Sequence, residues 1–220
     1  GITDTFDTNT SVIGSPRDLN RKLFLDFDGR NDYGQDTPIL GGLSTVTMMA
    51  WVNLNPALSG DGAEVGQDKF QIKVNSARNL QMVLNGTTTT YNTVTLNTAQ
   101  WYHVGVTFGG NALKLYLNGV DVMNIAQSGS IAADATPLTL GKNPIASNAY
   151  FNGKIDEVRI FNKNLTDAQF QRMVYQEIQN SASQVRGLII PKDVGTLPWT
   201  NILRYYRMDA YKDDIVDDLT

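Results

Sequence analysis

Two short runs of alternating polarity carry the acids whose positions could support chemistry. In the first run, Asp26 and Asp28 alternate with Leu25 and Phe27, a period of two that predicts a strand ending at Gly29. The two carboxylates therefore lie opposite the apolar side chains, beside a glycine turn. Calcium takes several oxygens from carboxylates, backbone carbonyls and water, so strand-end acids next to glycine backbone are candidate ligands.

The second run predicts a strand over residues 154–162 and contains Asp156. Simple alternation places Asp156 on the same face as Val158 and Ile160, with Glu157 on the other face. An inward carboxylate is costly unless it is paired, hydrogen-bonded or bound to a metal. Two roles are therefore open for Asp156: a metal ligand, or an acceptor of backbone amides or an arginine in a structural bond.

A loop and an aromatic side chain are candidates for ligand binding. Asn31, Asp32 and Tyr33 form the loop after the first acidic run, and their amide, acid and aromatic groups could bind a sugar. The alternative is a plain turn. Trp51 lies opposite the apolar face of the strand predicted over residues 46–54, so it is either an exposed platform for a sugar ring or a packing residue covered by a helix or a terminal segment.

The composition excludes several classes of protein. The chain has 220 residues, no Cys and one His, which excludes a disulfide scaffold, a cysteine nucleophile and a multi-histidine metal site. That single histidine, His103, shares a strand face with Trp101, and we expect it to be packed rather than catalytic. The net charge of −4 offers no field for nucleic acid, and no apolar run approaches ~18 residues, so we expect neither a nucleic-acid partner nor membrane insertion.

The elements between these residues predict an all-β protein. Strand patterns recur every ~8–12 residues with turn signals between them, which indicates an antiparallel sandwich or barrel. Asn85-Gly86 and Asn118-Gly119 are hairpin signals. One short helix is expected near the C-terminal side, because Thr166 and Gln169 form a capping box before an amphipathic run that ends near Asn180.

The order of these motifs resembles the laminin-G-like domains of the concanavalin A-like lectin/glucanase superfamily, of the type found in bacterial surface proteins. The matching segments are 25–33, 46–52, 101–108, 113–119, 151–162 and 165–168. The resemblance covers roughly residues 22–178. It implies a two-sheet antiparallel jelly-roll sandwich and a non-enzymatic role in carbohydrate or protein binding, often with one bound calcium ion.

The resemblance also suggests where a ligand would bind. A calcium site in this family often lies at the sandwich edge, so Asp28 and Asp156 are carried over as the candidate Ca²⁺ ligands. Asn31, Asp32 and Tyr33 beside that edge are the candidate glycan-binding residues.

The predicted organisation is an N-terminal arm over residues 1–21, a laminin-G-like domain over 22–180, and a linker and tail over 181–220. The segment 203–209 resembles the opening strand of a further domain of this family. Two interpretations stay open: the tail completes this sheet, or it begins another module. The tail contains two further groups of residues. We expect packing for the aromatics Trp199, Tyr205, Tyr206 and Tyr211. We expect a solvated turn for the acids Asp213, Asp214, Asp217 and Asp218.

A hydrolase is disfavoured. The related β-glucanases carry two glutamates and an aspartate alternating along one strand, whereas residues 155–159 lack the first glutamate, and alternation places Asp156 and Glu157 on opposite faces. We therefore expect a non-catalytic binding module of a larger extracellular or cell-surface protein, with a glycan or another surface polymer as its ligand and further domains as neighbours. The alternative is a structural spacer or protein–protein adhesion unit in a repeat array.

Overall fold

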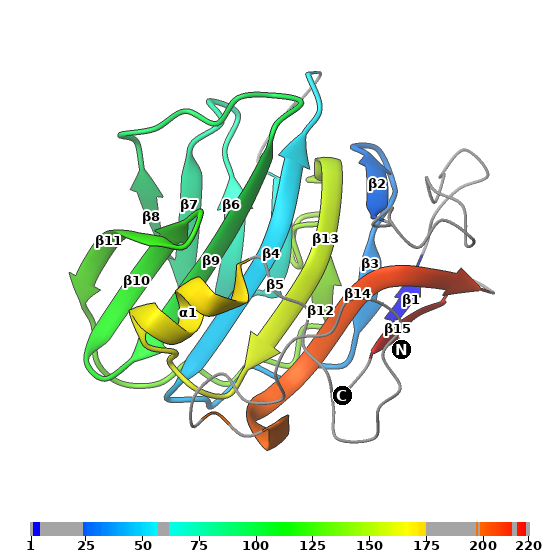
Figure 1. The fold of residues 1–220 in the computed structure, drawn as a ribbon. Coiled ribbons are helices and arrows are strands. Elements are labelled where there is room, and N and C mark those ends of the chain that lie inside the picture. The colour runs from blue at the N-terminus through cyan, green and yellow to red at the C-terminus, as the bar shows by residue number, and fades with distance from the viewer. Residues whose placement is uncertain are drawn as a thin grey trace.

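A computed structural model describes residues 2–4, 24–56, 62–174, 197, 199–212 and 215–218 of this chain. These residues form fifteen strands, one α-helix and one short 3₁₀ turn (Figure 1). The strands are β1 (Ile2–Asp4), β2 (Leu25–Asp28), β3 (Gly34–Asp36), β4 (Val46–Leu54), β5 (Gly62–Gln67), β6 (Phe70–Val74), β7 (Leu80–Leu84), β8 (Thr87–Tyr91), β9 (Trp101–Gly109), β10 (Ala112–Leu117), β11 (Val120–Ala126), β12 (Leu138–Leu140), β13 (Asn152–Phe161), β14 (Ile202–Lys212) and β15 (Ile215–Asp218). The helix is α1 (Asp167–Met173) and the 3₁₀ turn is η1 (Trp199–Asn201).

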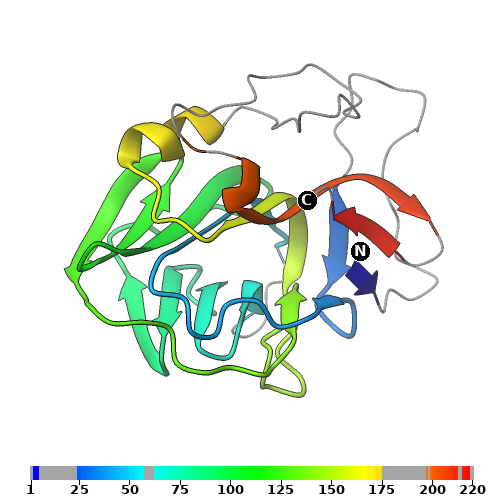
Figure 2. The same ribbon diagram turned by 90° about the horizontal axis from the view of Figure 1, so that it is seen from below.

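The strands make two facing layers (Figure 1). One layer has the order β11-β10-β9-β4-β13, with β2 and β14 both on the free edge of β13. The other layer has the order β3-β12-β5-β6-β7-β8. Strands β14, β15 and β1 connect the layers at one side of the sandwich, where the blue and red terminal strands lie together (Figure 2). Every pairing between named strands is antiparallel, which confirms the predicted jelly-roll sandwich.

The core lies between the layers and follows from the period of two along each strand. Val46, Met48 and Val52 of β4 belong to the same buried cluster as Ile72 of β6 and Met82 of β7. The positions between them on β4 are also largely buried, because the outer face of this layer carries a second apolar cluster under α1.

Helix α1 begins as predicted and seats on that outer face. Thr166 accepts a hydrogen bond from the Gln169 amide, and the Gln169 side chain accepts one from the Thr166 amide, so the capping box is confirmed. Phe170 stacks on the Tyr116 ring with a centroid distance of 4.0 Å. The helix ends at Met173, short of the predicted end near Asn180, and positions 175–180 lie outside the described residues.

The tail contributes strands to this sandwich. Tyr206 of β14 lies opposite Val158 of β13, and β15 pairs with β1, which in turn pairs with β3. Residues 202–206 therefore occupy the edge of β13 beyond the point where β2 ends, and Tyr211 and Lys212 pair with β15. The division into domains stays a prediction.

Candidate functional site

The loop between β2 and β3 is folded by its own acids. The Asp28 amide donates to Asp32 Oδ2 at 3.2 Å, and the Arg30 amide donates to Asp28 Oδ1 at 2.8 Å. Gly29 has a φ of +78°, and a Cβ there would lie 2.7 Å from the Asn152 Cβ, so the turn needs glycine both for its conformation and for its contact with β13. The loop is thus held against the first residue of β13.

The three predicted glycan-binding residues have different environments in this loop. Asp32 is only 1% exposed, and its carboxylate accepts a backbone amide, as expected of a turn. Asn31 is exposed and Tyr33 is half-buried, so these two side chains lie nearer the solvent. Asp32 therefore stabilises the loop, whereas Asn31 and Tyr33 contribute to the surface.

A second loop, which joins β12 to β13, lies beside the first. Lys142 and Tyr150 form an isolated antiparallel bridge, and the Asn143 amide donates to the Ala149 carbonyl at 2.9 Å. The Phe151 amide donates to the Gly141 carbonyl at 2.8 Å and closes the base. Residues 141–151 therefore form a hairpin-like loop at the rim where β13 starts (Figure 1).

The two loops bring together two aromatic rings and one cation, which we call the Tyr33–Lys142–Tyr150 cluster. The Tyr33 and Tyr150 rings have centroids 6.2 Å apart and are tilted by 44°. Lys142 Nζ lies 4.3 Å from the Tyr33 ring centroid and 5.5 Å from that of Tyr150. All three side chains are half-buried, so they contribute to the surface. Aromatic faces with polar tips and a nearby charge are groups that can bind a saccharide.

Sequence reasoning identified Tyr33 but missed Lys142 and Tyr150. These two residues lie more than 100 positions from Tyr33, in a segment that carried only turn signals. Lys142 follows the short apolar segment that forms β12, but this position becomes informative only when β12 is known to pair with β3.

The candidate calcium ligands are not brought together. Asp28 lies opposite Asn152 in the β2–β13 register, and Asp156 lies four residues further along β13, which is ~13 Å at the usual strand rise. Asp28 is exposed whereas Asp156 is 4% exposed. Across the described residues, no group of three or more His, Asp or Glu side chains is placed to hold a metal ion. Asp28 and Asp156 therefore do not fit one calcium ion between them.

The predicted orientation of Asp156 is wrong because β13 contains a bulge. The register with β4 shifts between Asp156 and Arg159, and Glu157 has a φ of +53°. The extra residue places Asp156 opposite Trp51, on the outer face of the layer, whereas Val158 belongs to the core between the layers. The expectation that Asp156 and Glu157 lie on opposite faces fails for the same reason.

Glu157 takes the structural role that was proposed for Asp156. Its Oε2 accepts hydrogen bonds from Arg159 Nη2 and from the Tyr205 hydroxyl, each at 2.7 Å, and its side chain is 2% exposed. Burial raises the pKa of Tyr205, so this hydroxyl stays a donor. The carboxylate thus joins β13 to β14 and is not available to a substrate.

The other aromatic candidates are packing residues. Trp51 is half-buried, and its Nε1 donates to the Val174 carbonyl at the end of α1, at 2.9 Å. His103 is 1% exposed and makes edge contacts with Trp51 and Phe170. In the tail, Tyr205 and Tyr206 are fully buried, as packing predicts.

The remaining tail candidates cannot be placed. The side chains of Trp199, Tyr211, Asp217 and Asp218 and the residues Asp213 and Asp214 lie outside the described residues.

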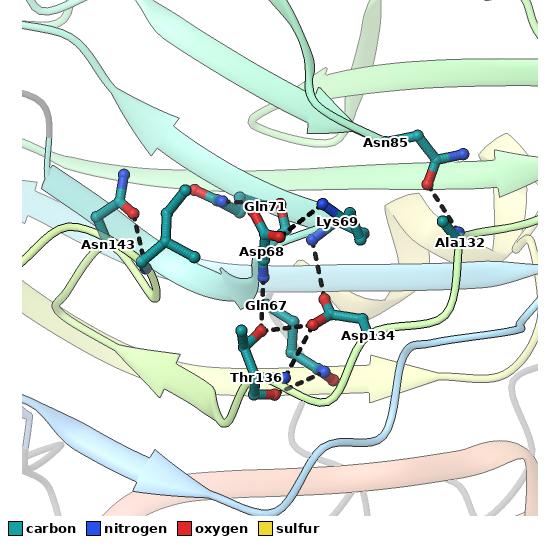
Figure 3. Close-up of polar contacts among 10 residues, drawn as sticks. Gln67, Asp68, Lys69, Gln71, Asn85, Ala132, Asp134, Thr136 and Asn143 are labelled. Carbon is teal, nitrogen blue, oxygen red and sulfur yellow. Dashed lines mark hydrogen bonds and ion pairs between the residues drawn. The ribbon is translucent and has the colours of Figure 1, made fainter.

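An open groove of about 610 Å³ is lined by Gly41 and Gly42 of the β3–β4 connection and by residues 130–135 of the β11–β12 connection. Its one acid, Asp134, accepts hydrogen bonds from the Lys69 amide at 2.9 Å and from the Thr136 amide and hydroxyl at 3.0 and 2.6 Å (Figure 3). Glycosidases need two carboxyl groups flanking the scissile bond. Among the groove's lining residues only one exists, and it holds the turns together.

The fold defines a class of protein: antiparallel β-sandwich domains made of two facing layers. The family described as the concanavalin A-like lectin/glucanases superfamily, of the laminin-G type, matches residues 28–171, and the chain belongs to this family. None of the curated proteins matches the chain.

Several solved structures share the fold. A Bacteroides ovatus protein provisionally assigned as carbohydrate-binding has a TM-score of 0.66 and 17% identity, over 88% of this chain and 54% of that one. A heptameric SAP-like pentraxin from Limulus polyphemus has a TM-score of 0.56 and 17% identity, over 71% of this chain and 83% of that one. Trypanosoma rangeli sialidase in complex with the inhibitor DANA has a TM-score of 0.59 and 11% identity, over 80% and 29%. These identities show a common fold and no more.

No helix among the described residues is both long and apolar enough to span a bilayer.

Proposed function

We propose that this chain is a non-catalytic carbohydrate-binding module whose ligand site is the rim formed by residues 28–33 and 141–151. The observation that carries the proposal is the Tyr33–Lys142–Tyr150 cluster, in which two half-buried rings and one ammonium from distant segments converge at the surface. Membership of a family of lectins and glucanases, and the fold shared with a Bacteroides ovatus protein provisionally assigned as carbohydrate-binding, support it.

The non-catalytic part of the proposal rests on where the acids lie. The Glu157 carboxylate accepts hydrogen bonds from Arg159 and Tyr205, and the Asp134 carboxylate accepts them from backbone and hydroxyl donors. Asp32 accepts a backbone amide inside its own loop. A glycosidase would need one carboxyl to donate a proton and a second to attack or to activate water. In the described residues these three acids hold the fold.

The setting of the module is also a proposal. We place it in a larger extracellular or cell-surface protein with neighbouring domains, since the shared fold covers only 54% of the Bacteroides ovatus protein. The ligand would be a glycan on a cell surface or in a matrix.

A glycan array tests the proposed function. Wild type should bind at least one class of saccharide, and Tyr33→Ala should weaken that binding about tenfold, equivalent to ~1.4 kcal/mol, because the ring face is lost. Tyr33→Phe is the matched control and should retain binding, since it keeps the ring. The array repeated in EDTA tests the calcium prediction separately. Absence of binding to every saccharide by a folded wild-type protein would contradict the proposal.

A further inference from the structure

We propose that Lys142 makes the rim selective for saccharides that carry an anionic group, and that it does so without a metal ion. The inference rests on the proposed function and names the ligand class of the same site. It rests on three observations in the described residues. Two tyrosine rings hold the lysine, no carboxylate forms an ion pair with it, and the acids of the neighbouring loop accept hydrogen bonds from backbone amides.

The lysine is held in place by two rings. Its Nζ lies 4.3 Å from the Tyr33 centroid and 5.5 Å from the Tyr150 centroid, within the range of a cation–π interaction with both. Its backbone is fixed by the bridge to Tyr150 at the base of the hairpin. An ammonium placed this way loses less freedom on binding a ligand than a lysine on an open surface.

Two other lysines of the sandwich, unlike Lys142, form ion pairs with carboxylates. Lys154 lies 3.8 Å from Asp26, and Lys114 lies 2.8 Å from Asp167. Across the segments that the structure describes, no carboxylate lies within 4.0 Å of Lys142 Nζ. Its partners in those segments are ring faces, which attract the charge but leave it uncancelled and able to pair with an anion.

The two acids of the β2–β3 loop accept hydrogen bonds from backbone amides of that loop. Asp28 Oδ1 accepts the Arg30 amide, and Asp32 Oδ2 accepts the Asp28 amide. These bonds fold the loop and draw the carboxylates into backbone contacts. A fixed ammonium beside the site also opposes a second cation there, because like charges repel. Lys142 therefore supplies the positive charge beside the two rings, and the exposed Arg30 is a second cation in the same rim.

The ligand group is a saccharide carboxylate or sulfate ester, since either accepts a charge-assisted hydrogen bond from an ammonium. Calorimetric titration at low ionic strength, with and without EDTA, would compare a galacturonic acid hexamer with its neutral methyl ester. A sulfated galactan oligomer and its desulfated form provide the second pair and separate the two anion sources.

Wild type should bind the charged member of at least one pair about tenfold more tightly than the neutral member, in EDTA as well. Lys142→Met should bring both members to the same affinity, whereas Lys142→Arg should keep the preference. Lys163→Met is the matched control: Lys163 is exposed beyond the far end of β13, so its loss should leave the preference unchanged. Thermal unfolding of each variant checks that it folds.

Four results would overturn the inference. Equal wild-type affinities for charged and neutral members, with Tyr33→Ala still weakening both, would remove the anion selectivity and leave the proposed function standing. A Lys142→Met variant with undiminished preference, or a preference abolished by EDTA, would assign the charge to another group. No binding of any of the four probes by wild type, combined with an empty glycan array, would overturn the inference and the proposed function together.

Discussion

Glu157 has a left-handed backbone conformation in the middle of β13, which is uncommon for a residue with a side chain. The β-bulge that contains it lies between the part of β13 that pairs with β2 and the part that pairs with β14. Its buried carboxylate then binds Arg159 and Tyr205, one from each of the strands β13 and β14. A single backbone irregularity thereby creates an ionic contact that fixes the tail.

Replacing this carboxylate should destabilise the fold. We expect Glu157→Gln to lower the free energy of unfolding by about 3–5 kcal/mol, because Arg159 stays buried without its anionic partner. Asp26→Asn is the control: its ion pair with Lys154 is 3.8 Å long and partly exposed, so its loss should cost less than about 1 kcal/mol. Urea unfolding measures both. Equal, small effects would show that the buried pair contributes little.

At the scale of elements, α1 depends on one glycine of β9. A Cβ at Gly105 would lie 2.4 Å from Phe170 Cζ and 2.9 Å from the Met48 carbonyl oxygen. Arg159 Nη1 and Trp51 Nε1 donate to the Met173 and Val174 carbonyls at the end of the helix. The position of the helix therefore depends on the absence of a side chain at Gly105 and on the two hydrogen-bond donors at the C-terminal end of the helix.

A methyl group added at Gly105 should push the helix away from β9. We expect Gly105→Ala to cost about 1–3 kcal/mol of stability through overpacking against Phe170. The double variant Gly105→Ala/Phe170→Leu should recover part of the loss, because the smaller side chain makes room. Thermal unfolding of the single and double variants tests this. A double variant that loses the sum of both single effects would place the strain elsewhere.

At the scale of the whole molecule, the tail links the two layers. Asp36 of β3 accepts hydrogen bonds from Arg204 Nε at 2.8 Å and from the Tyr206 hydroxyl, both on β14. Burial of the Asp36 carboxyl raises its pKa, but the bonds from Tyr206 and Arg204 outweigh burial, and the pKa falls below its ordinary value of 3.8. The contact is therefore sensitive to acid.

The sign of the pH dependence follows from that lowered pKa. A carboxyl with a lower pKa in the folded state stabilises the protein fully above its unfolded-state pKa, and this contribution is lost as the pH falls through the folded-state pKa. We expect the stability difference between wild type and Asp36→Asn to be constant above about pH 5 and to shrink below about pH 4. Melting temperatures of both proteins across this range measure it. A difference that is independent of pH would show that Asp36 does not act as an anion.

Much of the fold could be predicted from sequence, because its signals are local. The alternation over 46–54 and the capping box at Thr166 each depend on neighbouring residues, and the structure confirms both. The bulge at Glu157 was not predictable from alternation, which assumes an unbroken period of two. Its consequence was a wrong face for Asp156.

The candidate site was predictable only in part, for a different reason. Tyr33 belongs to a loop whose residue types indicate recognition, whereas Lys142 and Tyr150 reach it through the pairing of β3 with β12. That pairing joins segments more than 100 residues apart. Local patterns predict the face of a side chain where a strand is regular, but they do not predict which loops meet at a rim.

The central claim is that the rim formed by residues 28–33 and 141–151 binds a saccharide. Amide NMR spectra of the labelled protein, recorded during titration with the saccharide that binds best on the array, test it most directly. We expect the shifted amides to concentrate in these two loops and at the start of β13. Shifts concentrated at the groove lined by residues 130–135, or over α1, with both loops unchanged, would contradict it.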